Sequence, residues 1–450
     1  MPAVGTSGGS VTEARVRTVH LVALLACLVT AGIAVLLGFR AAELAAGRSL
    51  FETGRPAAEA VLMAVVALGL LAVVAFRPQT LRLPSLARTA ATWTLLLVAG
   101  IIGLWQVAYR ELELGALAGT AVSSTSEVEA VLTAHPPPVV PVYRIPTGLF
   151  LQSFEFLTGD NVLVSGYVWQ RYADAIPETI ERAVVFAESI DTKVFEEAYR
   201  SDLGDETLIG WYFEATLRQA FDYTRYPLDR QDVWVRLWSP SAAEGAVLVP
   251  DVASYDDLDP AALPGIEQEI VSTGWQPYVS GFTYSLHSYN TRFGRVDAPF
   301  RQDAPELFFN LGIKRDYGGP LLKHLPFTLA IAGLLFGIML LGTSDPDLRS
   351  RFGFQTLAVI ATTGALLLTV VVEHNGIRET VSAGQISYIE VLPFTLYGLI
   401  LLVTVNAIIR DRPDAPAFFD DRNNIWPVML YWPVFVGILF VATYVVFFVR

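Results

Sequence analysis

The sequence has very little of what disulfide, metal or nucleic-acid chemistry requires. Its 450 residues include one cysteine, Cys27, which lies in an apolar run and has no partner for a disulfide within the chain. The five histidines are scattered, and no two show the close spacing of a zinc site. The net charge of −13 argues against nucleic acid, because such binding needs clustered Lys and Arg. These shortages predict no metal site, no cofactor and no nucleic-acid partner.

Charge is scarce as well: 17% of the residues are charged and 53% are hydrophobic. Soluble domains carry about 25% charged residues, so the composition indicates a membrane protein. A helix needs about 20 apolar residues to cross the hydrocarbon core. Seven segments are long and apolar enough: 18–39, 57–76, 91–109, 321–342, 354–373, 388–409 and 428–449. The first also resembles a signal peptide, but its apolar run is too long for one, so a retained span is favoured.

Arginines near the ends of these spans indicate their orientation. With the N-terminus in the cytoplasm, the cytoplasmic ends carry about twice as many arginines as the opposite ends. This bias favours a cytoplasmic N-terminus, with residues 110–320 and the C-terminus outside. We therefore expect a multi-pass protein of the cell (inner) membrane, in contact with membrane lipids.

Between the third and fourth spans the sequence changes to short β-type runs. Residues 148–156 and 162–169 flank a turn and predict a β-hairpin. The remaining predicted elements are strands at 208–221, 232–238, 271–286 and 306–315, and a helix at about 177–200. Such spacing is typical of an antiparallel β-sandwich. The predicted fold class is a membrane protein of α plus β type with seven transmembrane helices. Three of them precede an extracytoplasmic sandwich in the chain, and four follow it.

Four regions follow from this interpretation. They are an N-terminal three-helix region (1–110), a linker (111–138), an extracytoplasmic β-sandwich (139–317) and a four-helix module (318–450). The linker is predicted from its small and polar residues, which end in Pro136-Pro137-Pro138.

One segment, Phe221-Asp-Tyr-Thr-Arg-Tyr-Pro-Leu-Asp-Arg-Gln231, resembles a loop of the pentameric ligand-gated ion channel superfamily, in its bacterial, cysteine-free form. That loop reads aromatic-Pro-aromatic-Asp-x-Gln, and Leu228 replaces the usual phenylalanine. Gly274-Trp275 and the strand that ends in Arg315 resemble the family's last two strands. Pro326 and Ser387-Tyr388 resemble its first and third pore helices. The resemblance covers about 310 of the 450 residues and leaves the three N-terminal helices unexplained.

The resemblance implies that the helix at 354–373 lines a pore shared by five copies. The favoured pore-lining residues are Thr356, Ile360, Thr363, Leu367 and Val370, with Glu373 at the outer end. An adjacent stripe holds Gln355, Val359, Thr362, Leu366 and Thr369. The alternative is that these threonines bond back to helix carbonyls or to neighbouring helices.

The family's coupling contact between sandwich and pore would comprise Asp160, Pro227, Asp229 and Arg315. Independent surface salt bridges are the alternative. The resemblance also implies a ligand site between subunits that is lined by aromatic residues, a type that can bind cations; the candidates are Tyr172, Phe186, Tyr289, Phe293 and Phe300. Aromatic residues of a sandwich are more often core residues, so that alternative stays open. The acidic run Asp251–Asp259 favours a solvated loop over a calcium site.

We therefore predict a ligand-gated ion channel subunit that assembles as a homopentamer and binds an unidentified small molecule, proton or ion. No nucleophile–base arrangement is present, so an enzyme is not expected. The alternatives are a seven-helix membrane sensor with a solute-binding periplasmic domain and a non-conducting relative of the channel fold. The N-terminal helices are expected to surround the pore module and to modify assembly or gating.

Overall fold

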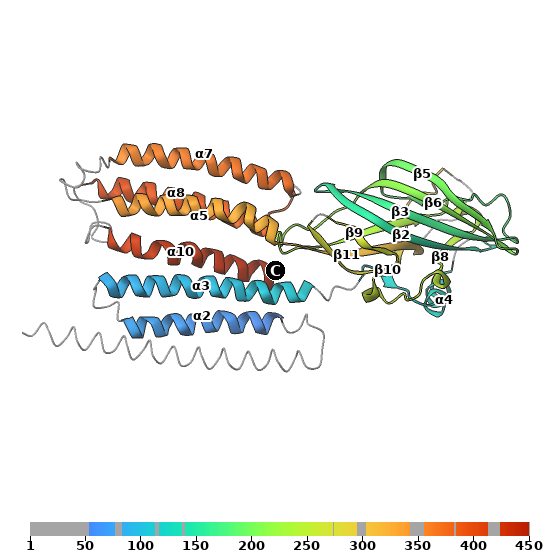
Figure 1. Cartoon of the computed structure of the whole chain (residues 1–450), viewed down its shortest axis with the longest axis horizontal. Coiled ribbons are helices and arrows are strands. Elements are labelled where there is room, and N and C mark those ends of the chain that lie inside the picture. The colour runs from blue at the N-terminus through green and yellow to red at the C-terminus, as the bar shows by residue number, and fades with distance from the viewer. Residues whose placement is uncertain are drawn as a thin grey trace, which may run out of the picture.

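The structure, a computed structural model, describes residues 54–76, 83–112, 117–136, 140–272, 274–294, 303–342, 355–381, 384–412 and 424–449. The predicted first span, 18–39, and the ligand candidate Phe300 lie outside these residues. Figure 1 shows a bundle of long helices at one end of the molecule and two β-sheets at the other.

The described residues contain six helices that are long and apolar enough to cross a membrane, as expected of a multi-pass membrane protein. They are α2 (Gly54–Phe76), α3 (Leu83–Leu112), α5 (Gly318–Leu341), α7 (Thr356–Thr380), α8 (Val391–Arg410) and α10 (Ile425–Tyr444). They match six of the seven predicted spans, although α3 begins eight residues before the predicted segment and α7 continues seven residues beyond its own.

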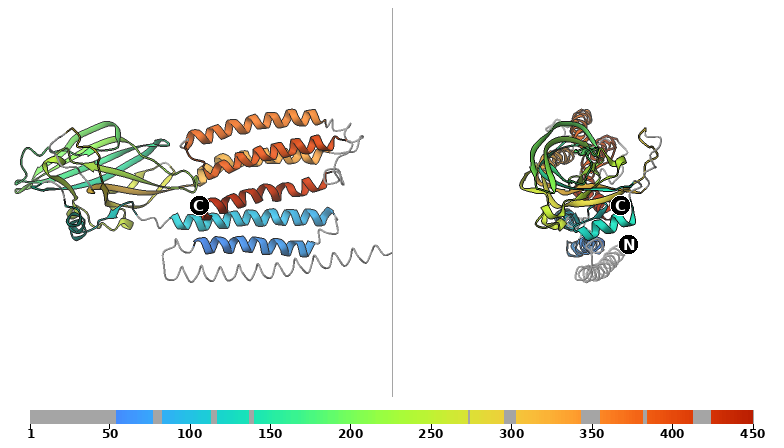
Figure 2. Two further views of the ribbon diagram at one scale, coloured as in Figure 1. Left: turned by 180° about the vertical axis from the view of Figure 1, so that it is seen from behind. Right: turned by 90° about the vertical axis from the view of Figure 1, so that its right-hand side faces the viewer.

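The helices lie side by side with α7 at one flank of the bundle and α2 at the other (Figures 1 and 2). Helix α7 packs mainly on α8, which also contacts α5 and α10. Helix α3 packs on α10, and α2 packs on α3. Of the six helices, α7 is the least buried by the rest of the chain.

The chain between α3 and α5 forms two sheets. One has the strand order β1-β10-β11-β7-β4, and the other has β5-β6-β3-β2-β8, with β9 paired to β2. The strands are β1 (Thr120–Ala121), β2 (Tyr143–Thr158), β3 (Asn161–Ala173), β4 (Val185–Phe186), β5 (Ser189–Asp202), β6 (Glu206–Arg218), β7 (Arg230–Trp238), β8 (Ala246–Pro250), β9 (Ile266–Val271), β10 (Trp275–His287) and β11 (Ala304–Arg315). All pairs are antiparallel except those of β2 with β8 and β9.

Alternating side chains close a common core between the sheets. In β7, for example, Val233, Val235 and Leu237 are buried, and the residues between them face outward. Residues of both sheets, such as Phe213 and Phe309, belong to one buried cluster. The hairpin predicted at 148–169 is confirmed as β2–β3, and the predicted pair at 271–315 as β10–β11.

One local prediction was wrong. Residues 177–200, predicted as a helix, contain a turn region, β4 and most of β5. Strand β5 is an edge strand whose charged side chains are mostly exposed, so its irregular mixture of acidic and apolar residues did not alternate as a buried strand does. Residues 111–138, predicted as a linker, contain β1 and a short helix, α4 (Thr125–Ala134), whose N-terminus is capped by the Ser124 side chain.

Candidate functional site

The two-sheet domain meets the helices at a junction that consists of the β6–β7 loop (219–229), Arg315 and residues 385–390. Arg315, the last residue of β11, donates from Nε to Asp229 Oδ1 at 2.6 Å and from Nη2 to Asp229 Oδ2 at 3.0 Å. Asp229 is 1% exposed, and it also accepts a 2.9 Å hydrogen bond from Gln231. A buried two-pronged ion pair therefore holds the loop against the end of β11.

Aromatic rings enclose the cation of this pair. The Arg315 guanidinium lies 4.0 Å from the ring centre of Trp275 and 4.7 Å from that of Tyr226. Burial raises the pKa of Tyr226 and of neighbouring Tyr223, so both phenols keep their protons. The peptide bond between Tyr226 and the buried Pro227 is cis.

Asp160, predicted as a further member of this contact, lies in the β2–β3 turn. Its backbone carbonyl accepts a 2.8 Å hydrogen bond from the amide of Gln219, which attaches the turn to the β6–β7 loop. Asp160 is exposed, and within the described residues no ion pair joins it to Arg315. Of the predicted coupling residues, Asp229 and Arg315 thus form the ion pair, and Gln231 adds a hydrogen bond to Asp229.

The β6–β7 loop is hydrogen-bonded directly to the segment that opens α8. The amide of Tyr388 donates to the carbonyl of Thr224 at 2.9 Å. The next amide, that of Ile389, donates to the carbonyl of Tyr226 at 3.1 Å. Backbone-to-backbone bonds of this kind fix the loop and the helix start relative to each other.

The two hydrophobic cores also interlock at the junction. Leu228, from the β6–β7 loop, is 1% exposed and belongs to the core cluster of the helices. Conversely, Ile377, Val381 and Ile389 come from the helical side and belong to the core cluster of the sheets. Because Ile377 is on α7 and Val381 follows its last residue, this helix is in direct contact with the two-sheet domain.

On the helical side of the β6–β7 loop, the fully buried carboxylate of Glu390 contacts polar groups of α7 and of the segment just before α8. Glu390 accepts from the amide and hydroxyl of Ser387 through Oε1. Its Oε2 lies 3.0 Å from His374 Nε2 and 2.6 Å from Arg378 Nη2. The pattern Ser-x-x-Glu at 387–390 is the sequence signature of a capping box, which predicts the first pair of contacts but not the partners on α7.

Glu373, the expected acidic residue at the outer end of the pore, also has a partner within the chain. Its Oε1 lies 2.6 Å from Nδ1 of His324 on α5, whose side chain is 2% exposed. The carboxylate thus ties α7 to α5 in this structure.

The structure divides the predicted pore residues between two faces of α7. Thr363 and Val370 are 2% and 0% exposed, and Thr404 of α8 donates to the Thr363 hydroxyl at 2.9 Å. Ile360 and Leu367 are each 40% exposed. Of the predicted stripe, Thr363 and Val370 are thus occupied by contacts within the chain.

Thr356, at the start of the predicted stripe, donates to Asp411 at 2.9 Å. The opposite face of α7 is exposed and mixed in character: Ala358, Ala361, Thr362, Ala365 and Thr369 are small or carry hydroxyls, whereas Leu357, Leu368 and Val372 are larger and apolar. The Thr362 and Thr369 hydroxyls donate to carbonyls one turn earlier, and both residues are exposed. The sequence does not single out this face, because both faces of α7 are similarly apolar.

A second cluster lies beside the loop that joins β10 to β11. It is near the C-terminal end of β7 and the N-terminal end of β11, whereas the junction is at the other end of both strands. Arg236 forms an ion pair with Glu306 at 2.5 Å, and its guanidinium lies 5.0 Å from the ring centre of Trp238. Tyr289 donates to the same carboxylate at 2.6 Å, and Phe293 packs edge-on against Trp238 and Tyr289. This aromatic cluster contains two of the predicted ligand residues, Tyr289 and Phe293.

The other described ligand candidates lie elsewhere and are buried. Tyr172 is 2% exposed, and the Arg182 guanidinium lies 4.5 Å from its ring centre. Burial raises the pKa of its phenol. Phe186 is 7% exposed and packs 4.6 Å from Phe213, between ring centres. Both residues thus act as core aromatics in this structure.

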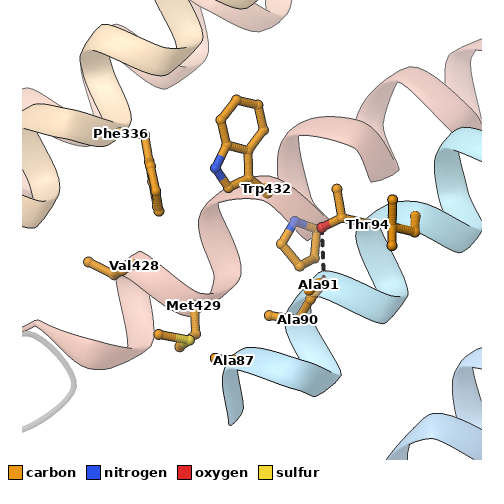
Figure 3. Close-up of a pocket in the computed structure, with 10 residues that line it drawn as sticks. Ala87, Ala90, Ala91, Thr94, Phe336, Val428, Met429 and Trp432 are labelled. Carbon is orange, nitrogen blue, oxygen red and sulfur yellow. Dashed lines mark hydrogen bonds between the residues drawn. The ribbon is translucent and has the colours of Figure 1, made fainter. Parts of the chain in front are cut away.

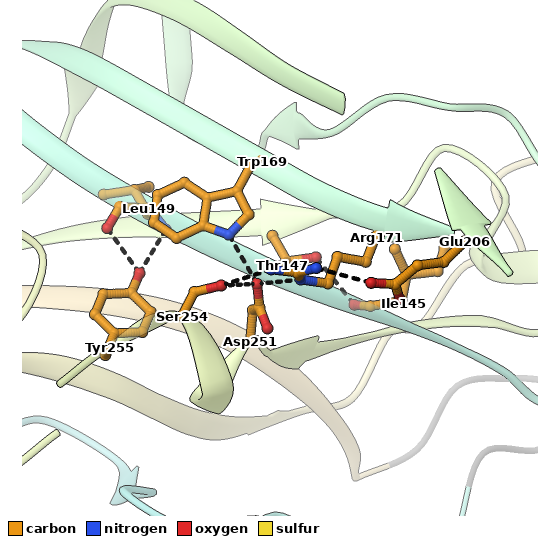
Figure 4. A network of polar contacts seen from close by, with 9 residues as sticks. All are labelled: Ile145, Thr147, Leu149, Trp169, Arg171, Glu206, Asp251, Ser254 and Tyr255. Atoms are coloured by element: carbon orange, nitrogen blue, oxygen red, sulfur yellow. Dashed lines mark hydrogen bonds and ion pairs between the residues drawn. The ribbon is translucent and has the colours of Figure 1, made fainter. Parts of the chain in front are cut away.

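The acidic run at 251–259 begins with a buried carboxylate rather than a ligand loop (Figure 4). Asp251 is 4% exposed and accepts from Trp169 Nε1 and Arg171 Nε, both at 2.9 Å. Arg171 also pairs with Glu206 at 2.7 Å. Within the part of the chain that the structure describes, no group of three His, Cys, Asp or Glu side chains is placed to hold a metal ion. Asp251 therefore attaches its loop to β3.

An apolar groove of about 400 Å³ lies between α3, α5 and α10 (Figure 3). Its walls are small residues of α3, such as Ala87 and Ala91, and large residues of α10, such as Met429 and Trp432. It contains no ionisable side chain and belongs to the helix segments that are apolar enough to span a membrane.

In comparisons with known proteins, no protein-family model matches the chain, and no curated protein matches it.

Proposed function

We propose that the chain is a subunit of a ligand-gated ion channel, five copies of which surround a pore bordered by α7. The observation that carries this proposal is the interlocked junction, where the sheet core includes Ile377 of α7 and the helical core includes Leu228 of the loop. A displacement of the loop therefore acts on α7 directly. The sequence resemblance to pentameric ligand-gated channels supports the same assignment, with the two sheets as an extracytoplasmic β-sandwich.

Two neighbouring strands connect the aromatic cluster with the junction. Strands β7 and β11 are hydrogen-bonded along their shared length. One ion pair between them, Arg236–Glu306, lies in the aromatic cluster, and another, Asp229–Arg315, lies at the junction. From Glu306 to Arg315 a strand spans about 30 Å at roughly 3.3 Å per residue. A ligand bound at the aromatic cluster would thus act on the junction through a continuous hydrogen-bonded element.

The exposure of the α7 side chains indicates which face of this helix could border a pore. A side chain buried inside one chain is not available to a channel shared by five, which argues against Thr363 and Val370 in this conformation. We assign the open face with Thr362 and Thr369 to the pore, because it is exposed and its hydroxyl oxygens can solvate ions. The position of α7 at the flank of the bundle leaves this face free for other copies (Figure 1).

Two measurements on the purified full-length protein test the proposal. Native mass spectrometry and single-particle imaging should show a five-fold ring with the α7 segments around its axis. Planar bilayers that contain the protein should show currents in response to acid or calcium steps. Monomers or dimers would refute the channel and favour the seven-helix sensor. A silent five-fold ring would instead indicate a non-conducting relative.

A further inference from the structure

The N-terminal helices reach the junction through the last turns of α3. Trp105 Nε1 donates to the Tyr388 hydroxyl at 3.1 Å, and this hydroxyl lies 2.7 Å from Thr443 Oγ1 of α10. Tyr388 is 8% exposed, and its backbone amide is the one that binds Thr224 of the β6–β7 loop. One residue thus joins the sheet loop, through its backbone, to α3 and α10, through its side chain.

One turn further along α3, Tyr109 makes a second contact. Its ring packs edge-on against Tyr317, with 5.3 Å between the ring centres. Tyr317 immediately precedes α5. The ammonium group of Lys314, next to Arg315 on β11, lies 5.1 Å from the ring centre of Tyr109. Helix α3 therefore contacts the end of β11 and the start of α5, as well as the start of α8.

Residues 118–121, which follow α3 in the chain, are hydrogen-bonded to the β10–β11–β7 sheet. The carbonyl of Ala118 accepts a hydrogen bond from the Asn310 side chain at 3.4 Å, and its amide donates to the carboxylate of Asp232. Thr120 and Ala121 then pair with β10 as strand β1. The N-terminal region is thus attached to the sheets and to the junction.

Helices α2 and α3 are closely packed, so a displacement of α2 would reach these contacts through α3. The ring of Trp93 on α3 lies over Gly69 of α2, where an added Cβ would come within 2.3 Å of it. Arg55, at the opposite end of α2, donates to the carbonyl of Phe448 at 3.0 Å. A movement of α2 is therefore passed to α3 and to the C-terminal segment.

We propose that Trp105 and Tyr109 are positioning residues through which the N-terminal helices set the geometry of the junction, as a second input besides the aromatic cluster. Their position on the same helix face, one against Tyr388 and the other against Tyr317, lets α3 act on the starts of α8 and α5 together. The effect on ion flow rests on the proposed channel function, but the positioning of the junction does not.

Hydrogen exchange of the full-length protein in phospholipid nanodiscs tests the positioning. Trp105→Phe removes the indole donor, and loss of a buried hydrogen bond should accelerate exchange in the peptide 385–392 on the order of five-fold. Thr94→Val, on the same helix, removes a hydroxyl that donates to the Ala90 carbonyl within α3; it is the matched control and should leave that peptide unchanged. Strand β3 should exchange at the wild-type rate in both variants, which separates a local effect from general destabilisation.

The Tyr388→Phe background shows whether the effect runs through the hydroxyl group. In that background Trp105→Phe should add no further acceleration, because the acceptor is already absent. If Trp105→Phe fails to fold, Tyr388→Phe alone removes the same bond from the acceptor side and should accelerate exchange in the same peptide. Unchanged exchange at 385–392 in Trp105→Phe, or equal acceleration by Thr94→Val, would overturn the inference. Currents of the same variants in response to acid steps measure the effect on ion flow separately. Accelerated exchange without any wild-type current would refute the channel and leave the positioning intact.

Discussion

The ion pair between Asp229 and Arg315 offers the most direct test of the junction. The substitution Asp229→Asn keeps the shape of the side chain and removes its charge. Arg315 would then remain as a cation, 14% exposed, with an amide oxygen in place of the carboxylate. Asp229 is 1% exposed, so solvent cannot replace the lost partner.

The magnitude follows from burial. Loss of one partner from a buried ion pair costs about 3–5 kcal/mol. The rings of Trp275 and Tyr226 contact the guanidinium before and after the substitution, so they do not change this difference, whereas the Asn amide oxygen can still accept a hydrogen bond and keeps the cost at the low end. We therefore expect a loss of about 3 kcal/mol in the free energy of unfolding of the two-sheet domain. For a domain of this size, that corresponds to a decrease in Tm of roughly 6–12 °C.

Thermal unfolding of the purified full-length protein, followed by tryptophan fluorescence, measures this decrease. Glu129→Gln is the matched control, because the Arg144–Glu129 pair is also two-pronged but is 49% and 43% exposed. Its expected cost is below about 1 kcal/mol. If Asp229→Asn shifts Tm no more than Glu129→Gln does, the buried pair does not stabilise the junction and the reasoning fails.

Three further outcomes follow from the described contacts. In a background without the native cysteine, a polar thiol reagent should modify Thr362→Cys and reduce current, whereas Thr363→Cys should resist modification; the reverse result would restore the original pore stripe. Burial raises the pKa of Asp232 to about 6 from 3.8, so its charged form destabilises the fold as pH rises through this window. Relative to the wild type, Asp232→Asn should therefore increase the free energy of unfolding by at most about 3 kcal/mol above pH 6 and leave it unchanged below pH 4. Tm measured across this pH range checks the prediction. Asp251→Asn should lower Tm by an amount similar to Asp229→Asn, and calcium or a chelator should change the wild-type Tm by less than about 1 °C.

Much of the fold could be predicted because local patterns and burial agree. Strand β3 alternates along nearly its whole length and follows a turn after β2, and six helices coincide with apolar runs. The region at 177–200 could not be predicted, because β5 gains its conformation from pairing with β6 along one edge only. Helix α4 is short, and its cap at Ser124 and two buried residues, Val128 and Leu132, were the signals available.

The candidate site was predictable only where one short motif contains it. The loop that ends in Asp229 and the strand that ends in Arg315 could be recognised separately, and the structure brings the two residues together. The partners of Glu390 come from α7, so no local pattern reveals them. The orientation of α7 depends on which face α8 covers, and apolar residues on both faces leave that choice to tertiary packing.

The two proposed inputs to α7 converge on the junction. Strand β11 ends in Arg315, which holds the β6–β7 loop, and Lys314 beside it contacts α3. Tyr388 receives that loop on its amide and α3 on its hydroxyl. Because both routes end on the same few residues, a displacement in the sheets and a displacement in the N-terminal helices must change the same hydrogen bonds. Their effects on α7 should therefore be non-additive, whereas sites that share no partner would give additive effects.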